Sequence, residues 1–405
     1  MREIIPNQQN TVYLRRWSIL ALSSALAVSA AALTIYLFND KPLQEMVSPV
    51  DPKFQSFDPK GMSKEELLRR AEVGNTYAQG FVAEHCKNGT GGFPKDSVLS
   101  FEWVHKAALG GNVLAKVEAG LCFFYGTGTD KDYFSALAMF VGPARDSNDA
   151  LAQCYMGYLN SGSYGFERND LIAFEWFRKS AAQGNAYGAV GYGRCLLLGL
   201  GIPKNAKEGI RQLHIGLNGG VADAACVLGW AYTTGEGVDK DLKEATRLYR
   251  FAMNRGSHLA ARYLARHYLN GEGVIKDDEE AAKLLKVASD AGDIEAKKSL
   301  GSLYHYGKGV VQDSAHASKL YLEVAISGDV ECQRVMGSRY QQGLGVPADY
   351  VEAYAWYNVC AASGDELAAK SRESLAQNLL ADQIAAAQKR SRGLLAEIKA
   401  KKAKK

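Results

Sequence analysis

The sequence has few of the residues on which enzymes and metal sites commonly depend. Its seven histidines are scattered, and no two of them have the four-residue spacing of ligands in a helical metal site. The Gly-x-Ser-x-Gly motif of serine hydrolases does not occur. We therefore expect no catalytic residues, no metal site and no cofactor, and we do not expect an enzyme.

Proline and net charge are also scarce. Nine prolines and 47% hydrophobic residues exclude a chain that is disordered throughout, because there is ample apolar surface to bury. The formal net charge is only +4, and five lysines among the last seven residues leave the rest of the chain at −1. No nucleic-acid partner is expected from this balance, and the lysine tail is interpreted as a solvated, frayed end.

One long uncharged segment lies near the N-terminus. From Trp17 to Phe38 there are 22 residues without a charge, about 33 Å of helix, which can cross a hydrocarbon core of roughly 30 Å. Arg15 and Arg16 precede it, so residues 1–16 are expected in the cytoplasm. This pattern predicts a transmembrane helix at 17–38 in the bacterial inner membrane, with the bulk of the protein in the periplasm.

A cleaved signal peptide is the alternative interpretation of the same segment. The small residues Val28-Ser29-Ala30 follow an apolar run of suitable length. Cleavage would leave the protein periplasmic or secreted instead of anchored. Residues 39–62, with four prolines and no apolar period, are predicted to be a linker.

Glycine is abundant, and its spacing indicates an internal repeat. Six glycines from Gly184 to Gly364 are 36 residues apart, and Gly-x-Gly pairs recur at the same spacing from Gly199 to Gly345. With less regular copies upstream, about eight units cover a domain at 63–365. Residues 366–405 are predicted to be a C-terminal helical cap and basic tail.

Each unit predicts a helical hairpin. In the first segment of a unit, small or large apolar residues recur at positions 4, 8, 9 and 12 after the terminal glycine, on one helical face. The ninth residue is small, which should let a partner helix approach closely. A second helix is expected after the glycine pair. Because one hairpin cannot bury its apolar face alone, the units must stack. The predicted fold is all-α, a right-handed α-solenoid of about eight 36-residue hairpins.

The last unit carries a recognisable set of residues. It contains Met336-Gly337, Tyr340, Gly343-Leu344-Gly345-Val346, Ala353, Trp356-Tyr357 and Gly364-Asp365. This pattern resembles the Sel-1-like repeat family, which is related to tetratricopeptide repeats. The resemblance implies a binding scaffold, usually without catalysis, and it does not name the ligand.

Two regions depart from the regular pattern. Gly142-Pro143 falls inside an expected second helix, and the turn at 161–166 lacks the glycine pair. We predict a bend or discontinuity near residues 142–168, with simple sequence drift as the alternative. After Asp365 two further helices are expected, and their apolar positions are predicted to cap the core: Leu375, Leu379, Ile384, Leu394 and Leu395.

Seven cysteines in an exported protein raise the question of disulfides. Six of them fall on predicted first helices, at differing positions, which argues against a regular series of bridges. We interpret them as buried small hydrophobic residues. Cys332 and Cys360 bracket one hairpin, and a bridge between them is left open.

A partner is expected to contact the first helices at positions that point away from the core, namely positions 3, 6, 7, 10 and 14 after the terminal glycine. These positions carry basic and aromatic residues, namely Tyr187, Arg194, Trp230, Arg262, Tyr263, Arg266, Lys298, Tyr306 and Arg334. Such a surface suits an anionic peptide terminus or an acidic saccharide. The alternative is that Lys298 and Arg334 form ordinary intrahelical pairs with Glu295 and Glu331.

Three functions are compatible with this pattern. The leading hypothesis is a membrane-anchored scaffold that binds protein components of a cell-envelope complex. The second is recognition of peptidoglycan or exopolysaccharide, suggested by Trp230 and the tyrosines beside the arginines. The third and least favoured is a weak hydrolase.

Overall fold

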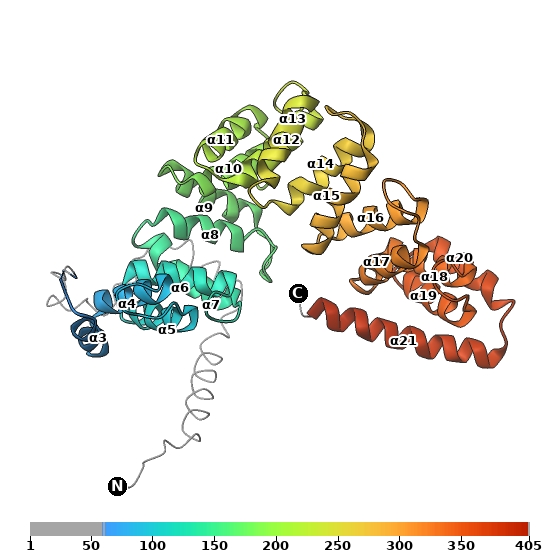
Figure 1. Ribbon diagram of the computed structural model, residues 1–405, viewed down its shortest axis with the longest axis horizontal. Coiled ribbons are helices and arrows are strands. Elements are labelled where there is room, and N and C mark those ends of the chain that lie inside the picture. Colours follow the sequence, from blue (N-terminus) through green and yellow to red (C-terminus); the bar gives the residue numbers. More distant parts are fainter. Residues whose placement is uncertain (1–58, 60, 404–405) are drawn as a thin grey trace, which may run out of the picture. The chain divides into compact units, whose positions relative to one another are not determined.

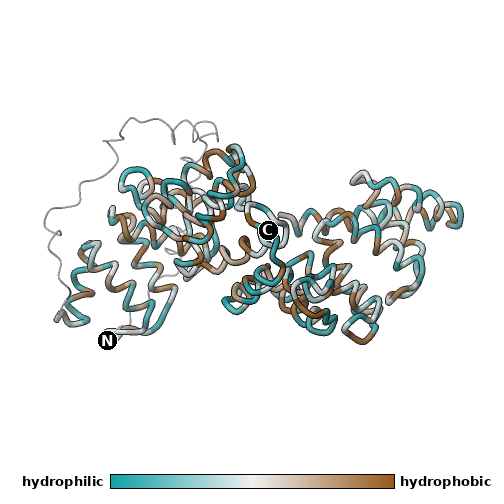
Figure 2. The backbone as a smooth tube through the Cα atoms, turned by 90° about the horizontal axis from the view of Figure 1, so that it is seen from above, coloured by the Kyte–Doolittle hydropathy of each residue, from teal (hydrophilic) through white to brown (hydrophobic). Residues whose placement is uncertain are grey.

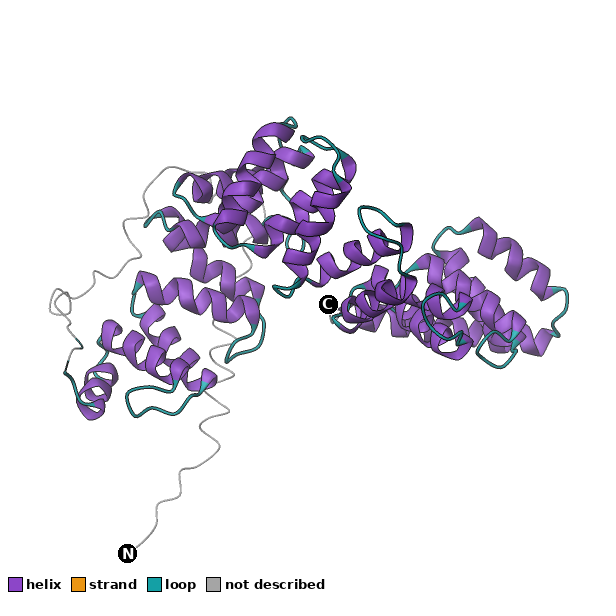
Figure 3. Ribbon diagram, turned by 45° about the horizontal axis from the view of Figure 1, so that its top comes forward, coloured by secondary structure: helices purple, strands orange, loops and turns teal. Residues whose placement is uncertain are grey.

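The described part of the protein, residue 59 and residues 61–403, is helical without strands in a computed structural model (Figures 1 and 3). These residues belong to one compact unit, Pro59–Lys405. The predicted membrane span at 17–38 and nearly all of its linker lie outside the described residues. No helix within the described range has the length and hydropathy needed to cross a bilayer.

Eight helical hairpins, here numbered as repeats 1 to 8, follow one another along this unit (Figure 1). The first helices are α4 (Thr76–Asn88), α6 (Val113–Tyr125), α8 (Ala150–Leu159), α10 (Ala186–Leu198), α12 (Ala222–Thr234), α14 (His258–Asn270), α16 (Ile294–Tyr306) and α18 (Val330–Gln342). The second helices are α5 (Ser97–Leu109), α7 (Tyr133–Arg145), α9 (Asp170–Ala182), α11 (Ala206–Asn218), α13 (Leu242–Met253), α15 (Asp278–Asp290), α17 (Ser314–Ile326) and α19 (Tyr350–Ala362). Helix α3 (Lys64–Glu72) precedes them, and α20 (Glu366–Ala376) and α21 (Ala381–Ala403) follow.

The helix ends are set by side chains that cap the free backbone groups. Asp241, for example, accepts from the backbone N–H groups of Lys243 and Glu244 at 2.9 and 3.0 Å at the start of α13. The regular first helices end on a glycine in the left-handed region, such as Gly271 with φ 70°. The 36-residue glycine spacing therefore reports helix ends, as predicted.

The two glycines of each pair have different roles. The first ends the helix, whereas a Cβ on the second would overlap the backbone of the preceding repeat. At Gly273 it would overlap the carbonyl oxygen of Leu242, and at Gly237 it would lie 2.8 Å from the Cβ of Ala206. The second glycine thus lets each turn pack on the start of the neighbouring second helix, a contact that the sequence did not reveal.

The small residue at position 9 after the terminal glycine is a point of close helix contact, as predicted. A Cβ on Gly229 would lie 2.7 Å from the Tyr249 ring, and one on Gly337 would lie 2.6 Å from the Tyr357 ring. Both rings come from the second helix of the same hairpin. The aromatic side chain therefore occupies the space that the missing Cβ leaves.

Repeats 4 to 7 share a continuous core, and smaller clusters lie on either side of it. One cluster of buried residues extends from Val190 in repeat 4 to Leu320 in repeat 7. Its largest fully buried members include Leu228, Tyr249 and Leu264. Figure 2 shows hydrophobic and hydrophilic stretches alternating along the helices, as expected for elements with one buried face.

The irregular region around repeats 2 and 3 is local. Helix α7 continues through Pro143 to Arg145, so the proline does not interrupt it; Pro143 lies in the last turn. Asn148, with φ 52°, takes the place of the usual glycine, and α8 has 10 residues where the other first helices have 13. The bend or discontinuity of the superhelix near residues 142–168 stays a prediction.

The C-terminal helices cover the end of the core, as expected. Leu375, Leu394 and Ile398 are buried, and α21 packs against α19 and α17. Arg390 on α21 bonds Glu352 on α19 at 2.7 Å. The helix extends to Ala403, so exposed Lys399 and Lys401 lie on it and are not part of a frayed end.

All seven cysteines are free thiols in the structure, including Cys332 and Cys360. Six are buried, which agrees with their interpretation as small hydrophobic residues. The Cys360 thiol donates to the Val330 carbonyl at 3.2 Å. Burial raises the pKa of Cys195 to about 11 and that of Cys226 to about 12.

Candidate functional site

Three of the predicted groove residues lie in ion pairs between adjacent repeats. Arg262 bonds Asp293 at 2.9 Å, Lys298 lies 3.4 Å from Asp329, and Arg334 lies 3.3 Å from Asp365. In each pair the aspartate is 31 residues further along the chain, where it caps the next helix. Asp293 and Asp329 cap the first helices α16 and α18, whereas Asp365 caps α20, so the third pair joins repeat 8 to the C-terminal helices. We call these contacts the inter-repeat ion pairs.

Each of these aspartates uses its two oxygens for different contacts. The Oδ1 atom of Asp293 accepts from the Ala296 backbone N–H at 2.8 Å, while its Oδ2 atom accepts from Arg262. Arg262 and Asp293 are 25% and 17% exposed, so the pair is partly shielded from water. The position-6 cations therefore hold repeats together, and their charges are already compensated.

The intrahelical alternative is half correct. Lys298 lies 3.7 Å from Glu295, as that interpretation expects. Glu331, however, contacts Lys298 of the preceding repeat at 2.6 Å. Burial alone would lower the pKa of Lys298, but the hydrogen bond that Lys298 donates to Glu331 and the charges of Asp329 and Glu295 raise it overall.

A second group of predicted residues does converge. Arg194, Trp230 and Tyr263 line a cavity of about 380 Å³ on the first helices of repeats 3 to 6. The lining also includes Tyr158, Leu198, Asp223 and Leu259. We call this cavity the repeat 3–6 pocket.

The repeat 3–6 pocket combines an aromatic wall with two unpaired charges. The Tyr263 ring stacks on the Tyr249 ring with centroids 5.3 Å apart, which holds it in place. Arg194 and Asp223 are exposed, and neither forms an ion pair within the described residues. Burial is the main cause that raises the pKa of Tyr158, and the charge of Asp223 adds to it.

The remaining predicted residues do not line this pocket. Tyr187 and Tyr306 are 51% and 65% exposed. Arg266 lies over the Tyr263 ring, 5.7 Å from its centroid. These three side chains therefore stay candidates for contacts at the rim or on neighbouring repeats.

A larger cavity lies on repeats 1 to 3, where the sequence had suggested no site. Its volume is about 950 Å³, and its apolar lining includes Leu114, Leu121, Tyr125, Leu151 and Tyr155. We call it the repeat 1–3 pocket. Leu114 occupies the outward third position of its repeat, so the same phase argument would have found it. Leu151 takes the third position only in the register that Asn148 sets in the structure, which the sequence did not reveal.

Eight segments of the chain match the Sel1 repeat, at residues 76–112, 113–140, 150–185, 186–211, 222–257, 258–293, 294–329 and 330–365. The chain belongs to the Sel1 repeat family. Proteins of this family are generally protein-interaction scaffolds. The second match ends at residue 140, just before Gly142-Pro143, which agrees with the local irregularity described above.

One solved structure of a Sel1 repeat protein supports the fold, and a second shows only a weaker structural similarity. A Sel1 repeat protein from Oxalobacter formigenes is 22% identical with a TM-score of 0.52, covering 83% of this chain and 98% of that one. A protective antigen with an SLR fold from uropathogenic Escherichia coli is 24% identical with a TM-score of 0.40, covering 84% and 88% of the two chains. No curated protein matches the sequence significantly.

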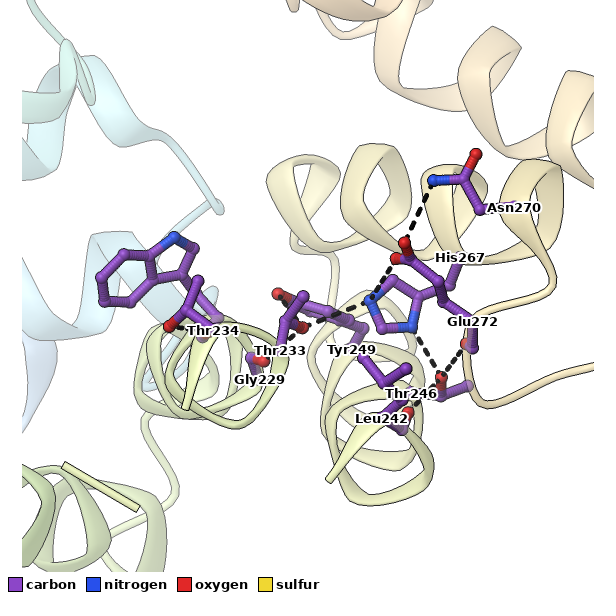
Figure 4. A network of polar contacts seen from close by, with 10 residues as sticks. Gly229, Thr233, Thr234, Leu242, Thr246, Tyr249, His267, Asn270 and Glu272 are labelled. Atoms are coloured by element: carbon purple, nitrogen blue, oxygen red, sulfur yellow. Dashed lines mark hydrogen bonds and ion pairs between the residues drawn. The ribbon is translucent and has the colours of Figure 1, made fainter. Parts of the chain in front are cut away.

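A buried polar network joins Sel1 repeats 5 and 6 (Figure 4). The His267 Nδ1 atom lies 2.9 Å from the Thr246 hydroxyl, which donates to the Leu242 carbonyl, and Nε2 lies 3.2 Å from Thr233 Oγ1. Glu272 lies 3.8 Å from Nε2. Because His267 is fully buried, this network stabilises the repeat interface and does not form an accessible site.

Proposed function

We propose that this Sel1 repeat protein is a non-catalytic scaffold of the bacterial cell envelope that binds a protein partner through the repeat 3–6 pocket. The observation that carries the proposal is the convergence of Arg194, Trp230 and Tyr263 from three successive repeats on one cavity. Aromatic and arginine side chains around a concave apolar surface are typical of protein-binding hot spots. The family's general role as an interaction scaffold supports the same function.

The pocket favours a partner segment that carries both apolar and polar groups. Its charged lining residues are one cation, Arg194, and one anion, Asp223. An apolar side chain can enter beside Trp230 while hydrogen-bonding groups meet these two charges. A purely acidic ligand is less favoured than the sequence suggested, because the position-6 cations are compensated by aspartates.

The proposal is tested with a variant that lacks two of the side chains lining the pocket. Full-length protein with Arg194→Ala and Trp230→Ala is expressed in cells, and crosslinked partners are quantified by mass spectrometry. We expect recovery of the main partner to fall at least about tenfold, since arginine and tryptophan anchors commonly contribute 2 kcal/mol or more.

The matched control for this experiment carries Leu171→Ala and Arg211→Ala. Both side chains are well exposed, on second helices α9 and α11, and neither lines the pocket. This control should recover the partner at the wild-type level. Equal recovery with the pocket variant and the wild-type protein would refute the proposed site.

Glycan recognition is the second candidate, and Trp230 favours it. The indole lies in a pocket with both a guanidinium and a carboxylate, groups that can bond sugar hydroxyls. Retention of the wild-type protein on purified peptidoglycan or exopolysaccharide, with loss in the Trp230→Ala variant, would favour this function. Retention that Trp230→Ala and Arg266→Ala leave unchanged would argue against it.

We further propose that residues 17–38 anchor the protein in the inner membrane, with the repeats in the periplasm. The uncharged segment and the preceding arginines support this orientation. An alkaline phosphatase fused after Met62 should be active and should fractionate with the membrane. Activity in the soluble periplasmic fraction would indicate cleavage, and an inactive fusion would contradict the orientation.

A further inference from the structure

We infer that the partner segment bound in the repeat 3–6 pocket continues, as an uncharged apolar stretch, into the repeat 1–3 pocket. This inference rests on the proposed function, because it extends the same interface along the first helices. It specifies the chemistry of the partner, namely an apolar stretch joined to a polar one.

The two pockets meet on helix α8. Tyr155 lines the repeat 1–3 pocket, and Tyr158, one turn later, lines the repeat 3–6 pocket. Their rings contact edge to face, with centroids 5.9 Å apart. A segment that leaves one pocket across these two rings therefore enters the other pocket while it stays on the first helices of the repeats.

The repeat 1–3 pocket presents apolar surface to solvent. Leu114 is 74% exposed and Tyr125 is 56% exposed. The hydroxyls of Tyr125 and Tyr155 bond each other at 2.7 Å, so their rings line the cavity while the polar atoms are satisfied. An apolar partner segment that covers these side chains would remove this surface from water.

The charges around the repeat 1–3 pocket are largely compensated within the protein. Lys87 bonds Glu118 at 2.8 Å, and Asp149 caps α8 by accepting from the Ala152 N–H at 2.7 Å. Lys95 is the remaining cation of the lining, and it is exposed. The pocket therefore complements an uncharged segment, in contrast to the unpaired Arg194 and Asp223 next to it.

The other end of the solenoid does not offer the same continuation. In repeats 7 and 8 the outward third position is Glu295 or Glu331, and the tenth is Ser302 or Ser338. At these two positions the apolar surface of the first helices therefore continues only on the N-terminal side of the repeat 3–6 pocket. This asymmetry gives the partner a direction along the groove.

A random dodecapeptide library displayed on phage tests the inference with the purified full-length protein. Twelve extended residues span about 40 Å, enough for one peptide to reach both pockets. We expect selected peptides to carry an uncharged aliphatic or aromatic stretch at one end and charged or polar residues at the other. Leu114→Glu should weaken a selected peptide at least about tenfold.

The control is Leu109→Glu, because Leu109 is 70% exposed but lies at the end of α5, outside both pockets. It should leave peptide affinity unchanged. Peptides that depend on Trp230 but not on Leu114 would overturn the inference and leave the proposed function standing. Failure of the wild-type protein to select any peptide would count against both.

Discussion

The glycine pair in the turn of repeat 6 allows a controlled test of how the repeats are joined. Gly271 and Gly273 have nearly equal φ angles, 70° and 69°. A Cβ on Gly271 would have its nearest neighbour at 3.6 Å, whereas one on Gly273 would overlap the Leu242 carbonyl of repeat 5. Alanine at either position therefore costs the same backbone strain, and only Gly273→Ala also disturbs the contact between repeats.

The expected magnitudes follow from this difference. Gly271→Ala should lower the free energy of unfolding by about 1–2 kcal/mol, the cost of a left-handed non-glycine residue. Gly273→Ala should lower it by a further 1–3 kcal/mol or so, because the backbone must shift to relieve the overlap. The extra loss should concentrate at the interface between repeats 5 and 6.

Urea unfolding of the full-length variants, followed by circular dichroism, measures this difference. Hydrogen exchange read by mass spectrometry should show faster exchange at the start of α13 in Gly273→Ala than in Gly271→Ala. Equal midpoints and equal exchange would refute the reasoning, since they would mean that the turn of repeat 6 does not rest on α13.

Three further outcomes are expected. Asp293→Ala should lower the free energy of unfolding by about 1–2 kcal/mol, mainly because the cap of α16 is lost, whereas Asp293→Ser should lower it less because serine can also cap a helix. Equal urea midpoints for the two variants would contradict the capping role of Asp293. Burial is the main cause that lowers the folded-state pKa of His267, so the unfolded chain binds more protons and stability should fall as the pH drops below about 6.5. The His267→Gln variant should lose less stability over that range, and parallel pH profiles would show that His267 does not contribute. Ellman's reagent should label the partly exposed Cys122 before the buried Cys195, and simultaneous labelling of both thiols without unfolding would contradict their burial.

The fold was largely predictable because a glycine pattern that says little on its own recurs in every regular repeat. One Gly-x-Gly pair is compatible with many structures, but pairs at a constant 36-residue spacing, in phase with apolar helical positions, indicate stacked hairpins. The close approach at Gly229 and Gly337 also followed from the phase, since a small residue recurs where helices must touch. The continuation of α7 through Pro143 could not be predicted from the residue type alone, because this proline lies in the last turn, where it disturbs a helix less than in the interior.

The candidate site was less predictable, because helical phase places a side chain on a face but does not show its partner. Arg262 points away from its own core, yet it meets Asp293 of the next repeat, 31 residues away. Ion pairs between residues three or four apart can be predicted from the spacing within one helix, whereas this pair depends on how two repeats stack. The convergence of Arg194 and Trp230 on one cavity likewise depends on that stacking.

Site-specific photocrosslinking in living cells tests the central claim most directly. A benzoylphenylalanine replaces Leu198 or Leu259, which line the repeat 3–6 pocket, or the exposed Leu171 or Val287 on second helices as controls. Crosslinks to one common protein are predicted from both pocket positions and from neither control. Crosslinks from the second-helix positions alone, or different proteins at the two pocket positions, would contradict a partner-binding pocket on the first helices of repeats 3 to 6.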